Sequence, residues 1–134
     1  MKSGGGIHTK EKIIAVMAEQ YILLVDESKV VEKLEFKYPV VLEIIPESIS
    51  LVEKSIKKLG GRFQMRTSSS KDGITISDHG LFLVDVDFSK EKMEDISKLD
   101  RQLREIVGVV DTSLFCHIAT KAIIAGENGI RIIE

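Results

Sequence analysis

The sequence predicts a mixed α/β and α+β chain. A partial Rossmann-like α/β portion is expected over residues 1–38 and 120–134, and a ferredoxin-like split βαβ domain over residues 39–119. Three observations support this fold class. A run of glycines at 4–6 leads directly into a segment with helical periodicity. Residues 39–119 read as strand, helix, strand, strand, helix, strand. Finally, two apolar segments flank a Gly-x-x-Gly turn near the C-terminus, which is typical of a hairpin.

In the first unit, we expect a helix from Thr9 to about Gln20, with the Thr9 side chain capping its first turn. Its apolar residues recur at helical spacing and predict one buried face, made by Ile13, Ile14, Met17 and Ala18. The apolar run at 21–25 predicts a strand covered on both faces, as in a parallel sheet. The C-terminal hairpin should pair residues 121–125 with 130–133.

In the second unit, prolines bracket a strand at 40–45, and an amphipathic helix should run from about Ser48 to the glycines at 60–61. Residues 62–66 predict a strand that leaves through a polar turn at 68–73, and Ile74 and Ile76 could extend its hairpin arm. Residues 82–88 alternate and predict a strand with one mostly solvated face. A second amphipathic helix should follow and end at Gly108, before a last strand within 109–119.

The composition is that of an ordinary globular protein. The 134 residues are 43% hydrophobic and 30% charged, enough for one core or two small ones. The 19 basic and 21 acidic residues are mixed along the chain, so no field favours nucleic acid or an anionic membrane as partner. Cys116 is the one cysteine, which excludes an internal disulfide and fits a reducing cytosol. Without a spanning segment or a signal peptide, we expect a cytoplasmic protein.

The glycine loop is the first candidate site. Lys2, Ser3, Gly4 and Gly5 precede a helix whose free amide donors could bind a phosphate or carboxylate, although glycines also serve tight turns. Glu11 lies in the first helical turn, where it either complements the helix dipole or acts as a base beside an anionic substrate. Lys29 follows a strand, at the sheet edge where α/β proteins bind ligands, so it is either a phosphate ligand or a solvated lysine.

The remaining reactive side chains suggest structural roles. The three histidines, His8, His79 and His117, are not spaced as metal ligands, so we expect no metal site, and His117 should be packed in an apolar strand. Asp85 and Asp87 share a strand face, where a solvated pair is favoured over a catalytic one. Cys116 should behave as a small buried hydrophobe.

Taken together, the motifs resemble type A ribose-5-phosphate isomerase in order and spacing over the whole chain. The matching stretches are Lys2-x-Gly4-Gly5-Gly6, Thr9–Ile14, Asp26–Lys29, Val40-x-x-Glu43-Ile44-Ile45-Pro46, Leu59–Gly61, Gly108–Val110, Leu114–Phe115 and the terminal Gly-x-x-Gly turn. The resemblance implies that Glu11 is the proton acceptor that moves a proton between C1 and C2 through an enediol. It also implies that Lys2, Ser3, Gly4 and Gly5 hold the substrate and that Lys29 binds its phosphate.

The same resemblance implies no metal and no cofactor, ribose 5-phosphate or ribulose 5-phosphate as ligand, and a homodimer or homotetramer assembled through the ferredoxin-like domain. Two departures matter. Ser3 stands where the family has a loop glycine, and the matching stretches correspond to the C-terminal part of the family's longer chain. We therefore expect these residues alone to be weakly active or inactive. They would be either a fragment or truncated product of such an enzyme, or half of a split enzyme whose partner is a separately encoded N-terminal half. The alternative is a non-catalytic oligomerisation or anion-binding module.

Overall fold

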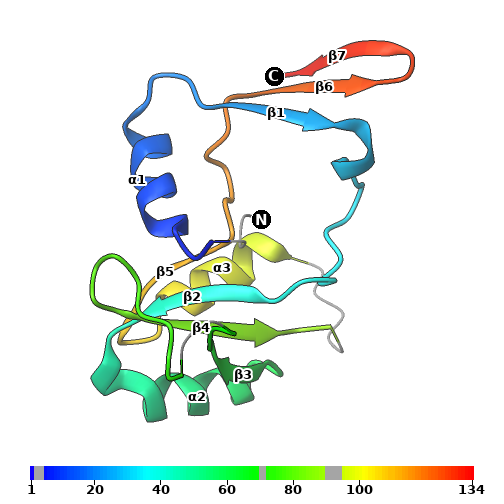
Figure 1. The fold of residues 1–134 in the computed structure, drawn as a ribbon. Helices are drawn as coiled ribbons and strands as arrows, with labels where there is room; N and C mark the ends of the chain where they lie inside the picture. The colour runs from blue at the N-terminus through cyan, green and yellow to red at the C-terminus, as the bar shows by residue number, and fades with distance from the viewer. Residues whose placement is uncertain (2–4, 70–71, 90–94) are drawn as a thin grey trace.

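The computed structural model describes residues 1, 5–69, 72–89 and 95–134. It contains three α-helices, two short 3₁₀ turns and seven strands in two sheets (Figure 1). In chain order they are α1 His8–Met17, β1 Ile22–Asp26, η1 Glu27–Lys29, β2 Val40–Ile44, η2 Pro46–Ser48, α2 Ile49–Lys58, β3 Arg62–Met65, β4 Phe82–Asp87, α3 Ile96–Arg104, β5 Val109–Thr112, β6 Lys121–Gly126 and β7 Gly129–Ile133.

A four-stranded antiparallel sheet holds the core. Its strand order is β3-β4-β2-β5, so β2 lies in the middle and every one of its residues is buried. Alternate residues of β2 and β4 share one face, and both α2 and α3 pack there. The resulting apolar cluster comprises Val40, Leu42, Ile44, Val52, Ile56, Val84, Val86, Phe88, Leu99, Leu103 and Leu114. The strands and helices expected over this stretch are confirmed.

The opposite face of this sheet is covered by α1 and by Gly6. Leu83 of β4 is buried beneath Gly6, and Glu43 and Asp111 are buried on the same side. The expectation of a mostly solvated face on β4 was therefore wrong at Leu83. Asp85 is also only partly exposed, because its carboxylate forms a forked ion pair with Arg66, with an Nη2 to Oδ1 distance of 2.6 Å.

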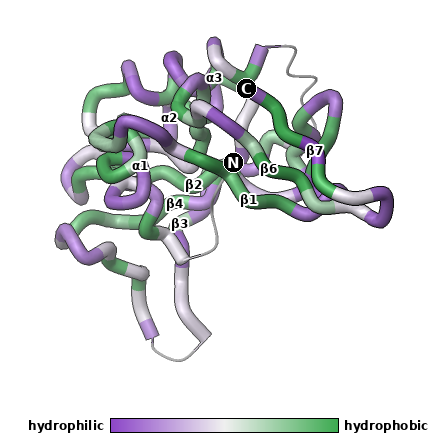
Figure 2. Tube along the Cα trace, turned by 90° about the horizontal axis from the view of Figure 1, so that it is seen from above, coloured by the Kyte–Doolittle hydropathy of each residue, from purple (hydrophilic) through white to green (hydrophobic). Residues whose placement is uncertain are grey.

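The second sheet has three strands in the order β1-β6-β7 and lies above the first in Figure 1. β1 pairs with β6 in parallel, and β6 and β7 form the expected antiparallel hairpin. Figure 2 shows hydrophobic stretches along these strands. β1 was expected to be buried on both faces, but Leu24 is 76% exposed and Ile22 is exposed as well. The hydrophobic run specifies a strand, while the described chain covers only one of its faces.

Helix α1 differs from expectation in the same way. Ile13, Ile14 and Met17 were predicted to form a buried face, yet Met17 is 80% exposed and both isoleucines are more than half exposed. The buried residues of α1 are instead His8, Thr9 and Ala15. The helix therefore docks on the four-stranded sheet through a largely polar surface. None of the helices described is long and apolar enough to cross a membrane.

Candidate active site

The glycine loop lies against the four-stranded sheet. Gly6 has a φ of +70°, and a Cβ built on it would lie 2.4 Å from Cδ1 of Leu83, so both its conformation and its packing require glycine. Gly5 is exposed, and the nearest atom to its hypothetical Cβ is 3.9 Å away, on Ile7. Lys2, Ser3 and Gly4 lie outside the described residues. The part of the loop that is described thus turns tightly and leaves the backbone at Gly5 accessible.

Helix α1 begins one residue earlier than expected, and Thr9 does not cap it. Ile7 is the N-cap, and no side-chain cap is formed there in the described chain. The Thr9 hydroxyl points to the sheet instead and donates to Oε2 of Glu43. Glu11 lies in the first turn, half-buried, with its amide bonded to the carbonyl of Ile7 at 3.1 Å. The first-turn amides and the helix dipole therefore favour anionic groups beside Glu11.

Glu43 is a buried carboxylate in the central strand, only 1% exposed. Its Oε2 accepts from Thr9, and its Oε1 lies 2.9 Å from Nδ1 of His79. Burial alone would raise the pKa of Glu43, but hydrogen bonds from Ser77, Thr9 and His79 outweigh it and hold the pKa below its ordinary value. Glu43 therefore stays ionised inside the protein and connects α1 with the loop before β4.

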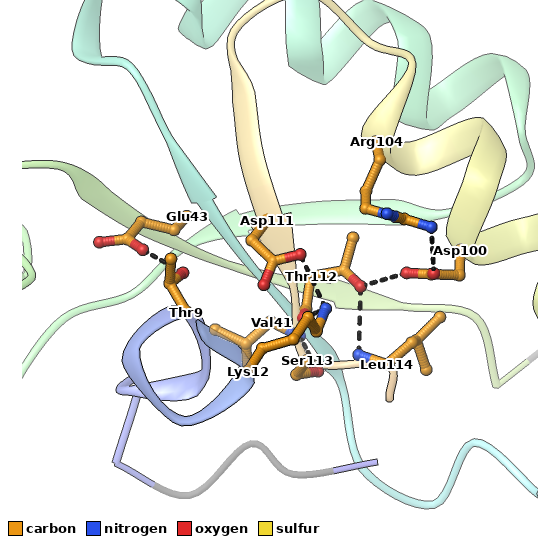
Figure 3. A network of polar contacts seen from close by, with 10 residues as sticks. All are labelled: Thr9, Lys12, Val41, Glu43, Asp100, Arg104, Asp111, Thr112, Ser113 and Leu114. Atoms are coloured by element: carbon orange, nitrogen blue, oxygen red, sulfur yellow. Dashed lines mark hydrogen bonds and ion pairs between the residues drawn. The ribbon is translucent and has the colours of Figure 1, made fainter. Parts of the chain in front are cut away.

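Lys12 makes the second polar contact of α1 with the sheet (Figure 3). Its Nζ donates to Oδ1 of Asp111 and to the backbone oxygen of Thr112, both at 2.7 Å. The ammonium also lies 5.1 Å from the ring centroid of Phe115. Both side chains of the Lys12–Asp111 pair are nearly buried, at 12% and 10% exposure, so water screens this pair less than a surface ion pair.

His8 completes the buried side of α1. It is 1% exposed, and neither ring nitrogen has a hydrogen-bond partner among the described residues. Burial lowers the pKa of His8, although Asp111 and Glu43 nearby oppose this effect. Burial thus favours the neutral form of the His8 ring. His79 binds a carboxylate, although no role was predicted for it. His117, expected in an apolar strand, is instead exposed, at a φ of +56°, with Nε2 2.9 Å from Oγ of Ser97.

Lys29 ends the η1 turn at the carboxyl end of β1, as predicted, and is exposed. The turn is fixed by Asp26, whose carboxylate accepts from the amide of Ser28 at 2.9 Å. α1 and η1 lie at opposite ends of β1 (Figure 1). Along the chain, β1 therefore lies between Glu11 and Lys29.

Sequence reasoning missed Thr9, Lys12, Glu43 and Asp111 as parts of the site. One signal was available: Glu43 is the single charged residue in an otherwise apolar strand, and buried carboxylates are rare unless they are paired.

Asp87, expected to be solvated, pairs with Arg62 at 2.5 Å. Cys116 is half-buried, and burial raises the pKa of its thiol. The described residues contain no group of three or more metal-ligating side chains placed to hold an ion.

The comparison with protein families decides which family this arrangement belongs to. The model of ribose 5-phosphate isomerase A (phosphoriboisomerase A) matches residues 1–129. The chain belongs to the ribose 5-phosphate isomerase A family. A ribose-5-phosphate isomerase A of Thermosynechococcus vestitus is 39% identical over 127 residues, which are 95% of this chain and 52% of the relative. That of Methanosarcina acetivorans is 39% identical over 99% of this chain and 55% of its own.

Solved structures of the family share the fold. The ribose 5-phosphate isomerase A of Methanocaldococcus jannaschii superimposes with a TM-score of 0.89 at 33% identity, over 100% of this chain and 58% of that one. A D-ribose-5-phosphate isomerase in complex with phospho-erythronic acid gives a TM-score of 0.88 at 32% identity, again over 100% and 58%. This chain thus spans about half the length of the family members it matches.

Proposed function

We propose that this chain takes part in the interconversion of ribose 5-phosphate and ribulose 5-phosphate, with Glu11 as the proton acceptor. The match to the isomerase family over residues 1–129 carries this proposal. It is supported by the place of Glu11 in the first turn of α1, directly after the glycine loop. A carboxylate beside free amides and the positive end of a helix suits proton transfer on an anionic sugar phosphate.

The reaction needs one base and hydrogen-bond donors for the oxygen that develops negative charge. The Glu11 carboxylate removes the proton from C2 of the aldose, and the electron pair of that C–H bond becomes the C1–C2 double bond of an enediol as the C1 carbonyl oxygen gains a proton. Return of the proton to C1, with loss of the proton from the C2 hydroxyl, gives the ketose. Lys2 and the backbone of Ser3, Gly4 and Gly5 would stabilise the developing oxyanion. No electrons enter or leave, so the step requires no redox partner.

Lys29 is proposed as a ligand of the substrate phosphate. It is exposed at the carboxyl end of β1, which is the end of the strand farther from α1. In this proposal the carbonyl end of the sugar phosphate binds at Glu11 and its phosphate binds at Lys29. A lysine ammonium is a suitable partner for phosphate. The phospho-erythronic acid bound by the solved relative also carries both a phosphate and a carboxylate group.

We also propose the domain division and assembly that the sequence suggested. The four-stranded sheet, with strand order β3-β4-β2-β5 and helices α2 and α3 on one face, supports a ferredoxin-like unit over 39–119. The parallel β1–β6 pair supports a partial Rossmann-like portion over 1–38 and 120–134. A homodimer or homotetramer in the cytoplasm remains our expectation for the assembly.

The test is hydrogen isotope exchange in deuterated water. An enediol route transfers deuterium to C1 of the ketose and C2 of the aldose, which NMR detects even at low turnover. The chain is incubated with ribose 5-phosphate, alone and with the portion of the Methanocaldococcus jannaschii relative that it does not cover. Deuterium should be incorporated at least when the added portion is present, and Glu11→Gln should abolish this incorporation. The control Glu19→Gln changes an exposed carboxylate beyond α1 and should retain the activity.

A non-catalytic module is the second candidate. The exposed edge of β1 and the exposed apolar residues of α1 favour assembly with another polypeptide. Tight assembly with the added portion, but no deuterium incorporation in either arm by a folded chain, would support this module and contradict the isomerase proposal.

A further inference from the structure

Two buried carboxylates form a matched pair of acceptors beneath α1. Glu43 in β2 and Asp111 in β5 stand directly opposite each other on adjacent strands, on the same face of the sheet. Directly opposed side chains in an antiparallel pair have Cβ atoms about 4.5–5.5 Å apart. Their partners on α1, Thr9 and Lys12, are three residues apart, and such helix positions have Cβ atoms about 5–6 Å apart. The spacing of the donors on the helix thus fits the spacing of the acceptors on the sheet.

This docking is unusual in its chemistry. Like charges opposite each other on a sheet are unfavourable, and burial of carboxylates adds a desolvation cost. The cost is offset by Lys12 at Asp111 and by Thr9 and His79 at Glu43. Meanwhile Ile14 and Met17, which could have packed on a sheet, face away. Directional hydrogen bonds fix the rotation of a helix about its axis more narrowly than apolar packing does.

That rotation determines where Glu11 lies. With about 100° per residue, Thr9 and Lys12 are roughly 60° apart around the axis of α1. Glu11 is roughly 100° from Lys12, on the side of Lys12 that is away from Thr9. The outer side of the same turn is tied to the loop before β4 by Lys10, whose Nζ lies 2.7 Å from Oδ2 of Asp78. The first turn is consequently held from two directions, and Glu11 projects from the part that neither anchor occupies.

We propose that Glu43 and Asp111 are positioning residues for Glu11, which they hold in place through Thr9 and Lys12; the catalytic half of this statement rests on the proposed function. Both carboxylates are buried and bonded to side chains of α1. Their effect is on the orientation of the first turn of α1. Loosening one anchor should therefore lower the rate of proton transfer and leave substrate affinity nearly unchanged.

The test uses a matched pair of variants, Thr9→Val, which removes the hydroxyl donor at similar volume, and Thr9→Ser, which keeps it. In Thr9→Val, amides of the first turn of α1 should exchange with solvent at least tenfold faster, while those of β2 do not change. The ¹³C signal of the Glu11 carboxyl should broaden. Deuterium incorporation into ribose 5-phosphate should slow at least tenfold at an unchanged half-saturating concentration. Thr9→Ser should restore all three properties, and Glu43→Gln should resemble Thr9→Val.

Unchanged exchange of the α1 amides in Thr9→Val would overturn the anchoring. Faster exchange with an unchanged rate of deuterium incorporation would overturn the positioning of Glu11. A parent chain that is inert even with the added portion contradicts the proposed function instead. The Glu11 carboxyl signal then decides this inference, which fails if the spectrum of Thr9→Val is the same as that of the parent.

Discussion

The hydroxyl of Thr112 donates to Oδ1 of Asp100 at 2.5 Å and thereby joins the end of β5 to helix α3 inside the protein (Figure 3). Both residues are buried, and the same hydroxyl oxygen accepts from the amide of Leu114 at 3.1 Å. The second oxygen of Asp100 pairs with Arg104 at 3.0 Å. One hydroxyl therefore satisfies a buried carboxylate and a buried amide at once.

Thr112→Val should therefore lower the free energy of unfolding by about 1–3 kcal/mol, the usual cost of leaving a buried polar group without its partner. The two side chains are similar in volume, so the loss reports hydrogen bonding more than packing. Urea denaturation followed by circular dichroism measures it. Thr112→Ser keeps the hydroxyl and should be less destabilised; equal losses in both variants would show that the methyl group, and not the hydroxyl, matters here.

Gly108 should not tolerate a side chain. Its φ is +97°, and a Cβ would lie 2.1 Å from Cβ of Ser48. Gly108→Ala should cost about 2–4 kcal/mol of unfolding free energy, from backbone strain together with the overlap. Gly73 has a similar φ of +107°, but no described atom lies within 4 Å of its Cβ position.

Gly73→Ala is thus the matched control, with an expected loss of only about 1 kcal/mol from conformation alone. Adding Ser48→Gly to Gly108→Ala should recover part of the larger loss. If the two alanine variants were equally stable in thermal denaturation, the overlap at Ser48 would be absent in solution.

His8 should make the protein less stable in mild acid. Because the pKa of His8 is lowered in the fold, the unfolded chain binds more protons below its ordinary pKa of about 6.5. Its contribution is complete above that pH and is lost as the pH falls toward the folded pKa. Unfolding free energies measured by urea titration should therefore fall between pH 7.5 and pH 5.5. Lys12, Asp111 and Glu43 are the charged groups that act on this ring.

His8→Leu should flatten this dependence, since the side chain no longer titrates. His117→Asn serves as the comparison, because His117 is an exposed histidine at a positive φ that asparagine tolerates. A pH dependence that survives in His8→Leu at full slope would assign the effect to another group.

Lys29→Ala should weaken the binding of a phosphorylated ligand. Loss of one exposed ammonium at the proposed phosphate position is expected to raise the Kd for phospho-erythronic acid about tenfold, or about 1.4 kcal/mol. Isothermal titration calorimetry of the chain with the added family portion measures this. Lys33→Ala removes an exposed lysine from the segment after η1 and should leave the Kd unchanged. Equal effects of the two variants would indicate a general charge effect without a specific site.

The sequence predicted the fold best where the elements with a clear apolar pattern pack against one another within the same segment. In the segment from β2 to β5, β2 is a nearly continuous apolar run, β4 alternates, and α2 and α3 repeat at helical spacing. These elements bury one another's apolar faces. The pattern failed at Ile14, Met17 and Leu24, because periodicity marks a face that can be buried without saying what covers it. The predicted positions of Glu11 and Lys29 on a first turn and at a strand end agree with the described elements.

The contacts beneath α1 could not be predicted for a different reason. Thr9 and Glu43 are 34 positions apart, and Lys12 and Asp111 are 99 apart, so no local pattern connects them. Thr9 also had a good local alternative as a helix cap, which the structure does not use. Only the charge within the apolar strand hinted that Glu43 needed a partner.

The pairing of β1 with β6 has a consequence for how this chain is made. Tyr21 and Thr120, which bond at the start of that pair, are separated by 99 positions. A ribosome adds about 5–20 residues per second, so β6 is synthesised about 5–20 s after β1. The sheet that contains β2, β4 and β5 is already synthesised by then. The strand that separates Glu11 from Lys29 is therefore among the last parts of the protein to acquire its neighbours during translation.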